Sequence, residues 1–119
     1  MSVRKVGIEK ITAYPCSLSL DMRTLAEARG VDPAHPLEEL LVTARSLNPV
    51  WEDPVTMAVN AALSLLADED REAIELIVVG TESSPDFGKP ISTYVQRYCG
   101  IQANCRNFEK QDSRESFRA

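Results

Sequence analysis

The hydrophobic pattern predicts three strands along the chain. Residues 5–14, KVGIEKITAY, carry apolar side chains near every second position, which is typical of a strand. Residues 74–80, IELIVVG, show no such alternation, and a run of this kind is typical of a parallel strand covered on both faces. Residues 103–110, ANCRNFEK, are predicted to form a further strand.

Capping residues mark two helices in the first half of the chain. Asp21 is expected to cap the start of the first helix, and Gly30 fits the left-handed position that follows its last turn. The second helix is capped by Asp53 and starts at Pro54, where the missing N–H costs nothing. Between them, a short helix is predicted over residues 37–45.

A third strong helical pattern connects two of the predicted strands. It starts with Pro90 as its first residue and ends at Gly100. Strand 74–80, this helix and strand 103–110 form a strand–helix–strand unit of about 35 residues. The fold class is therefore α/β.

Glu82 directly follows the predicted parallel strand and is a candidate for chemistry. Ligands of open α/β sheets bind at the carboxyl ends of the strands, where loops present their side chains. A carboxylate at this edge can serve as a general acid or base. Geometry alone also allows a solvated loop glutamate, since many such loops carry one.

Composition fits one small domain and excludes some partners. The chain has 119 residues, of which 44% are hydrophobic and 26% charged. Its formal net charge of −5 argues against nucleic acid, because phosphate binding needs a basic surface. No apolar run approaches the roughly 18 residues of a membrane span, and the first residues do not resemble a signal peptide. We therefore expect a cytoplasmic protein with no membrane contact.

Cysteine and histidine give no sign of a metal site or a disulfide framework. Cys16, Cys99 and Cys105 are odd in number, and no pair has the CxxC spacing. Reduced thiols are expected, with Cys99 and Cys105 in the core. His35 is the single histidine, so we predict no zinc site.

Several segments resemble the hydroxymethylglutaryl-CoA synthases, in the same order. VGTESSPDFGKPISTY matches the segment that holds the catalytic glutamate of this family, and GIQANCRNFEKQ follows it. VGIEKI, LDMRTLAEARGVDP and EDPVTMAVNAA extend the resemblance, which covers residues 6–111. The form ESxxDFGKxxSTY is most similar to the branch that installs β-branches on polyketide chains.

The resemblance implies a thiolase-like fold and a partial chain. Residues 1–111 would be a partial N-terminal synthase domain, with helices layered on a mixed or parallel sheet. Residues 112–119, DSRESFRA, would be an unrelated tail, because Ser113 stands where the family has its nucleophilic cysteine. The family's catalytic histidine belongs to a later segment, and His35 does not match it.

The resemblance also implies an acyltransferase reaction. A cysteine takes an acetyl group from a thioester, a glutamate removes a methyl proton, and the carbanion attacks a β-keto thioester before hydrolysis. Glu82 takes the place of that glutamate as general acid and base, and Asp32 and Pro33 match a segment near the coenzyme or carrier arm. No cofactor is implied. The expected partners are acyl carrier proteins or acyl-CoA, with a homodimer for full-length members.

Two alternatives to an active condensing enzyme stay open. The chain alone is expected to be inactive, since the nucleophilic cysteine and the catalytic histidine are not found in it. It would then be a non-catalytic module that binds a carrier protein or dimerises with a full-length relative. Alternatively, it is a fragment of a mevalonate-pathway synthase, although EDPVT and DFGK favour the polyketide branch.

Overall fold

The computed structural model describes residues 6–111, which form two compact units. One unit contains residues 15–53, and the other contains residues 6–14 together with residues 54–111. The predicted tail, residues 112–119, lies outside the described residues, as does Ser113. The prediction of a single domain over residues 1–111 stays a prediction.

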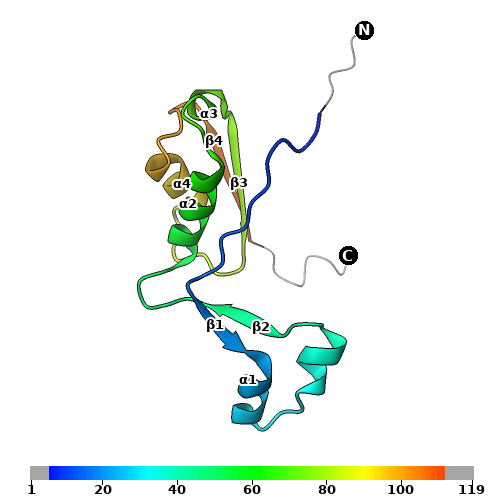
Figure 1. Ribbon diagram of the computed structural model, residues 1–119. Helices are drawn as coiled ribbons and strands as arrows, with labels where there is room; N and C mark the ends of the chain where they lie inside the picture. The colour runs from blue at the N-terminus through cyan, green and yellow to red at the C-terminus, as the bar shows by residue number, and fades with distance from the viewer. Residues whose placement is uncertain (1–5, 112–119) are drawn as a thin grey trace, which may run out of the picture. The chain divides into compact units, whose positions relative to one another are not determined.

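The unit of residues 15–53 is built on a two-stranded antiparallel ribbon (Figure 1). The register pairs Leu18 with Leu47 and Asp21 with Ala44. Its elements are β1 (Leu18–Asp21), α1 (Met22–Arg29), a π-helical turn η1 (His35–Glu39) and β2 (Ala44–Leu47).

Helix α1 begins and ends where its capping residues predict. The side chain of Asp21 accepts a hydrogen bond from the backbone N–H of Thr24 at 2.8 Å. This bond lowers the pKa of Asp21 below its usual value, because it stabilises the ionised carboxylate. At the other end, Gly30 takes a left-handed conformation with φ of 64°, and its N–H bonds the carbonyl of Glu27 at 3.1 Å.

We expect Gly30→Ala to destabilise this unit through the backbone alone. No atom lies within 4 Å of a Cβ built at Gly30, so the cost comes from forcing an L-residue to a positive φ. That cost is about 1 kcal/mol. Gly30→Asn should lose less, because asparagine tolerates this conformation. Urea unfolding of both variants beside Gly7→Ala, a control in open space, measures the difference. Equal losses for alanine and asparagine would contradict the argument.

The predicted helix over residues 37–45 is wrong from residue 40 onward. The helical turn ends at Glu39, and Leu41 has a φ of 55°. The chain then extends into β2, which begins at Ala44. Pairing with β1 satisfies the backbone groups of this stretch, and this tertiary contact overrides its helical pattern. Strand β1 itself was not predicted from the sequence.

The predicted strand at residues 5–14 is also not observed within the described part, residues 6–14. The apolar side chains of this segment are not buried against a core, since the relative exposures are 96% for Val6 and 85% for both Ile8 and Ile11. The segment is tied down by side chains instead. Lys10 Nζ lies 2.7 Å from Asp70 Oδ2, and the hydroxyl of Ser64 donates to Thr12 Oγ1 at 3.2 Å.

The Lys10–Asp70 pair should hold this segment only in a limited pH range. The hydrogen bond between the two side chains raises the pKa of Lys10 and lowers the pKa of Asp70. A lowered carboxyl pKa means that the stabilisation is lost as the pH falls through a value below the ordinary 3.8. NMR shifts of the Lys10 side chain should therefore change in acid. Asp70→Asn should reduce that change to the smaller contribution of Glu9 and Glu69, and Glu72→Gln should keep it in full. An undiminished response in Asp70→Asn would contradict the assignment.

The second unit is a strand–helix–strand arrangement preceded by a helix. β3 and β4 run parallel, with Val78 opposite Phe108, and α2 and α4 lie on the same side of this pair (Figure 1). Pro90 is the N-cap of α4 rather than its first residue. No helix within residues 6–111 is long and apolar enough to cross a membrane. The elements are α2 (Pro54–Leu65), α3 (Asp70–Ala73), β3 (Leu76–Thr81), α4 (Ile91–Tyr98) and β4 (Arg106–Gln111).

The core of this unit lies between the helices and one face of the sheet. Ile91 and Val95 of α4 are buried, and Ile77 and Val79 of β3 pack against their cluster. The other face of the sheet is exposed, and it includes Leu76, Val78 and Phe108. Coverage of strand β3 on both faces, expected from its unbroken apolar run, is therefore wrong for the described chain.

Candidate active site

Glu82 lies immediately after β3, at the carboxyl end of the parallel strand pair. The preceding residue, Thr81, is the last of the strand and pairs with Gln111 of β4. The side chain of Glu82 is exposed and lines an open hollow of about 410 Å³ together with Gly80, Thr81 and Lys110. The carboxylate therefore occupies the edge of the sheet at which α/β proteins bind their ligands.

Hydrogen bonds between residues close in sequence define the shape of the loop that follows. Thr81 Oγ1 accepts a hydrogen bond from the N–H of Ser83 at 3.0 Å, beside Glu82. Further along, Asp86 Oδ1 accepts from the N–H of Gly88 at 2.7 Å, and the hydroxyl of Ser84 donates to the Asp86 carbonyl at 3.0 Å. These are local side-chain-to-backbone bonds of the kind that define turns, so the loop's shape is largely encoded by its own residues.

The far end of the loop is held by a residue that the sequence reasoning missed. Glu109 Oε2 accepts a hydrogen bond from the N–H of Ile91, the first residue of α4, at 2.6 Å. A signal for this bond exists in the sequence. Pro90, at the N-cap, has no side-chain oxygen, so the first N–H of the helix needs an acceptor from another element.

Asp32 and Pro33, the predicted coenzyme-arm residues, lie in the unit of residues 15–53, whereas Glu82 lies in the other unit. Asp32 Oδ1 accepts a hydrogen bond from the N–H of Ala34 at 2.9 Å, and the carbonyl of Pro33 accepts from Leu37 at 3.2 Å. Asp32 also borders a mainly apolar cavity of about 210 Å³. The other residues that line this cavity are Met22, Leu25, Ala26, Arg29, Val31, His35, Pro36 and Leu40.

The cysteines of the described chain are placed as core residues. Cys16, Cys99 and Cys105 are all buried and reduced. Burial raises the pKa of the Cys99 and Cys105 thiols, which disfavours the reactive thiolate. The thiol of Cys16 donates to Asn48 Oδ1 at 3.0 Å. None of these cysteines lines the hollow beside Glu82.

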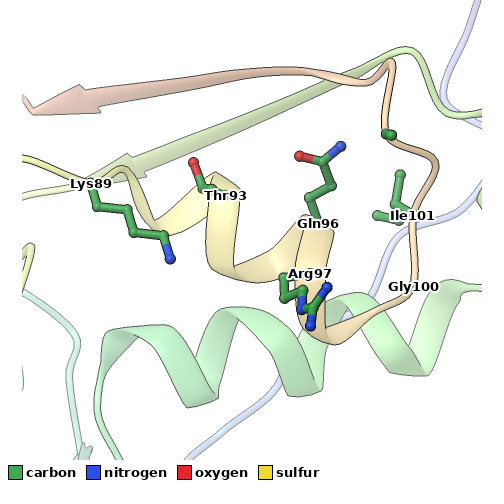
Figure 2. A pocket seen from close by; sticks show the side chains of 7 residues that line it. Lys89, Thr93, Gln96, Arg97, Gly100 and Ile101 are labelled. Atoms are coloured by element: carbon green, nitrogen blue, oxygen red, sulfur yellow. The ribbon is translucent and has the colours of Figure 1, made fainter.

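A larger open cavity, of about 560 Å³, runs along the outside of α4. Figure 2 shows Thr93 and Gln96 extending toward the strands, while Lys89 and Arg97 extend away from them. The Lys89 ammonium stacks on the ring of Tyr94, 4.1 Å from its centroid. The cationic groups therefore do not converge with the polar groups on one point, as the groups of a built ligand site would.

Curated relatives match this chain at about 40% identity. It is 41% identical to a hydroxymethylglutaryl-CoA synthase of Enterococcus faecalis over 108 residues, which are 91% of this chain and 28% of that protein. It is 40% identical to the polyketide biosynthesis 3-hydroxy-3-methylglutaryl-ACP synthase PksG of Bacillus subtilis over 106 residues, 87% of this chain and 25% of PksG. The chain thus spans about a quarter of the length of these relatives.

Solved structures agree with the sequence relatives, although no family model matches the chain. An HMG-CoA synthase complexed with CoA matches with a TM-score of 0.75 and 39% identity, covering 83% of this chain and 26% of that one. The HMG synthase of curacin biosynthesis, in complex with acetyl donor-ACP, matches with a TM-score of 0.75 and 40% identity, covering 88% and 26%. The expected thiolase-like α/β fold is confirmed over these residues. The chain is therefore a homologue of the hydroxymethylglutaryl-CoA synthases and matches about a quarter of their length.

Proposed function

We propose that this chain is part of an acyltransferase that condenses an acetyl thioester with a β-keto thioester, with Glu82 as its general acid and base. One observation carries this proposal. Glu82 lies at the carboxyl end of a parallel strand and faces an open hollow, within a segment that is about 40% identical to synthases. Its relatives include synthases named for CoA and a synthase named for polyketide biosynthesis.

The proposed reaction gives Glu82 two proton transfers. With the acetyl group on a thiol, the carboxylate takes a proton from the acetyl methyl, and the resulting carbanion attacks the ketone carbon of the β-keto thioester. The ketone oxygen becomes an alkoxide, which receives a proton from the Glu82 carboxyl. Water then hydrolyses the bond to the thiol. Because α-protons of thioesters are weakly acidic, the base must lie close to the methyl and be shielded from water.

The shielding has to come from other parts of a synthase. Glu82 is exposed in the described chain, and the neighbouring face of the sheet carries the exposed side chains of Val78 and Phe108. We propose that the remainder of a synthase subunit covers this edge and supplies the acyl-accepting cysteine and the histidine. By itself, the chain is proposed to be inactive and located in the cytoplasm.

Asp32 and Pro33 are proposed to contact the arm that carries the acyl group. Asp32 borders an apolar cavity, which suits the apolar stretches of a flexible carrier arm. The matching structures that were solved with CoA and with a donor-ACP support either carrier, and an ACP carrier agrees with the relative PksG, which is named as a polyketide biosynthesis ACP synthase. A homodimer is proposed for the complete enzyme.

A non-catalytic carrier-binding module is the second candidate. The burial of all three cysteines favours it, because no exposed thiol within residues 6–111 could accept an acetyl group. In that case the chain would bind a carrier protein without turnover.

A hybrid synthase tests the proposed function. Residues 6–111 would replace the matched segment of the Enterococcus faecalis synthase, and the release of condensed product would be measured with acetyl-ACP and with acetyl-CoA. Product from either donor supports the acyltransferase, and preference for acetyl-ACP supports the polyketide branch. A folded hybrid that accepts an acetyl group but forms no product would refute the catalytic proposal. Binding of a carrier protein by the chain itself, measured by calorimetry, would then favour the module.

A further inference from the structure

Glu109 connects the last described strand to the first turn of α4. Its carboxylate accepts the backbone N–H of Ile91 at 2.6 Å, in a partly buried environment. In the parallel register, Glu109 lies opposite Val79 of β3. Glu82 follows Val79 closely in sequence, so the bond spans the strand–helix–strand unit at the level of the candidate site.

This bond is of a strong kind. It joins an ionised acceptor to a backbone donor, and such charge-assisted bonds are shorter and stronger than neutral ones. It also places a negative charge at the N-terminus of α4, where the helix dipole favours one. Pro90 at the N-cap makes no side-chain hydrogen bond, so Glu109 supplies a cap that the local sequence lacks.

The loop between β3 and α4 is consequently anchored at both ends. At its start, the hydroxyl oxygen of Thr81 accepts a hydrogen bond from the backbone N–H of Ser83, and these two residues flank Glu82. At its end, Glu109 holds the backbone of Ile91. Between them, the turn at Asp86 limits the conformations of the loop. Releasing the second anchor would leave Glu82 on a loop that is fixed only where it leaves the strand.

The same strand also contributes to the hollow that Glu82 faces. Lys110, the residue after Glu109, lines the hollow together with Glu82. Successive side chains of a strand point to opposite faces, so Glu109 can reach the helix while Lys110 reaches the hollow. Strand β4 therefore contributes to the wall of the hollow through Lys110 and holds the start of α4 through Glu109.

We propose that Glu109 is a positioning residue for Glu82: its carboxylate holds the N-terminus of α4 and so fixes the far end of the catalytic loop. This inference rests on the proposed function in one respect, namely that Glu82 acts on substrate. The hold of Glu109 on the loop is independent of that function and can be measured in the chain as it stands.

Amide hydrogen exchange of the whole chain tests the hold directly. In Glu109→Gln, the exchange of the Ile91 amide and of the loop amides at residues 82–84 and 86–89 should accelerate by about tenfold, because a charged acceptor is lost. Glu109→Ala, which keeps no acceptor, should accelerate it further. Amides of α2 should not change, which shows that the fold persists. Glu75→Gln, an exposed carboxylate beside β3, is the matched control and should have no effect. Unchanged loop exchange in Glu109→Gln would overturn the proposal.

Kinetics of the hybrid synthase separate positioning from folding. Glu109→Gln should lower kcat for condensation by about tenfold, with KM and acetylation of the nucleophile unchanged, since acetylation does not use Glu82. An equal loss in acetylation and condensation would mean a structural role only and would overturn the proposal. If Glu82→Gln leaves condensation intact, the proposed function fails. The exchange rates still decide whether Glu109 holds the loop.

Discussion

Replacing Glu82 by glutamine should abolish condensation and leave acetylation of the nucleophile intact. Glutamine has nearly the same shape as glutamate but cannot accept the methyl proton. General acid–base catalysis contributes roughly 10²- to 10⁴-fold to a rate, so a loss in this range is expected. The hybrid synthase, loaded with acetyl donor, would report the two steps separately: acetyl-enzyme by mass spectrometry and condensed product by chromatography.

The control for this substitution is a carboxylate away from the hollow. Glu72 of α3 is exposed and does not line it, so Glu72→Gln should leave both steps unchanged. Because glutamine at position 82 fills the same space, the folded fraction should stay constant across the three proteins. Normal condensation in Glu82→Gln would remove this residue from the mechanism, and loss of acetylation together with condensation would indicate a role in donor binding instead.

The position of Glu82 could be predicted because it depends on local and nearby signals. A run of apolar residues predicts β3, and Pro90 and Gly100 mark the limits of α4. Two parallel strands with a helix between them then determine which end of β3 carries the loop. The caps of α1 could be predicted for the same reason, because Asp21 and Gly30 bond backbone groups that lie within a few residues of them.

Features that depend on a distant partner could not be predicted. Residues 44–47 become a strand because β1 pairs with them, and nothing in their own sequence requires this. Residues 6–14 have the alternation of a strand but make no ladder in the described chain. Pro90 indicates that the start of α4 needs an acceptor from another element, but it does not identify Glu109, because the contact with Ile91 joins residues far apart in sequence.

The core beside the candidate site should be the most sensitive point for stability. Ile91 is 1% exposed and lies in a cluster with Val95 and Cys99, against which Val55 and Val59 of α2 pack. Ile91→Ala leaves a cavity between the two helices, and substitutions of this kind cost about 2–5 kcal/mol. A domain of this size has a total stability of about 5–15 kcal/mol, so the variant should unfold at much lower urea concentration. Circular dichroism during urea unfolding measures the shift.

The matched control for Ile91→Ala uses the same substitution at an exposed site. Ile11 is 85% exposed and contributes nothing to the core, so Ile11→Ala should change the free energy of unfolding by less than about 0.5 kcal/mol. Since the N–H that Glu109 holds belongs to the backbone of Ile91, alanine keeps this bond, and the loss reports packing alone. Similar losses at the two positions would mean that the interface of α2 with α4 does not hold this unit together, and that the loop of Glu82 is supported in some other way.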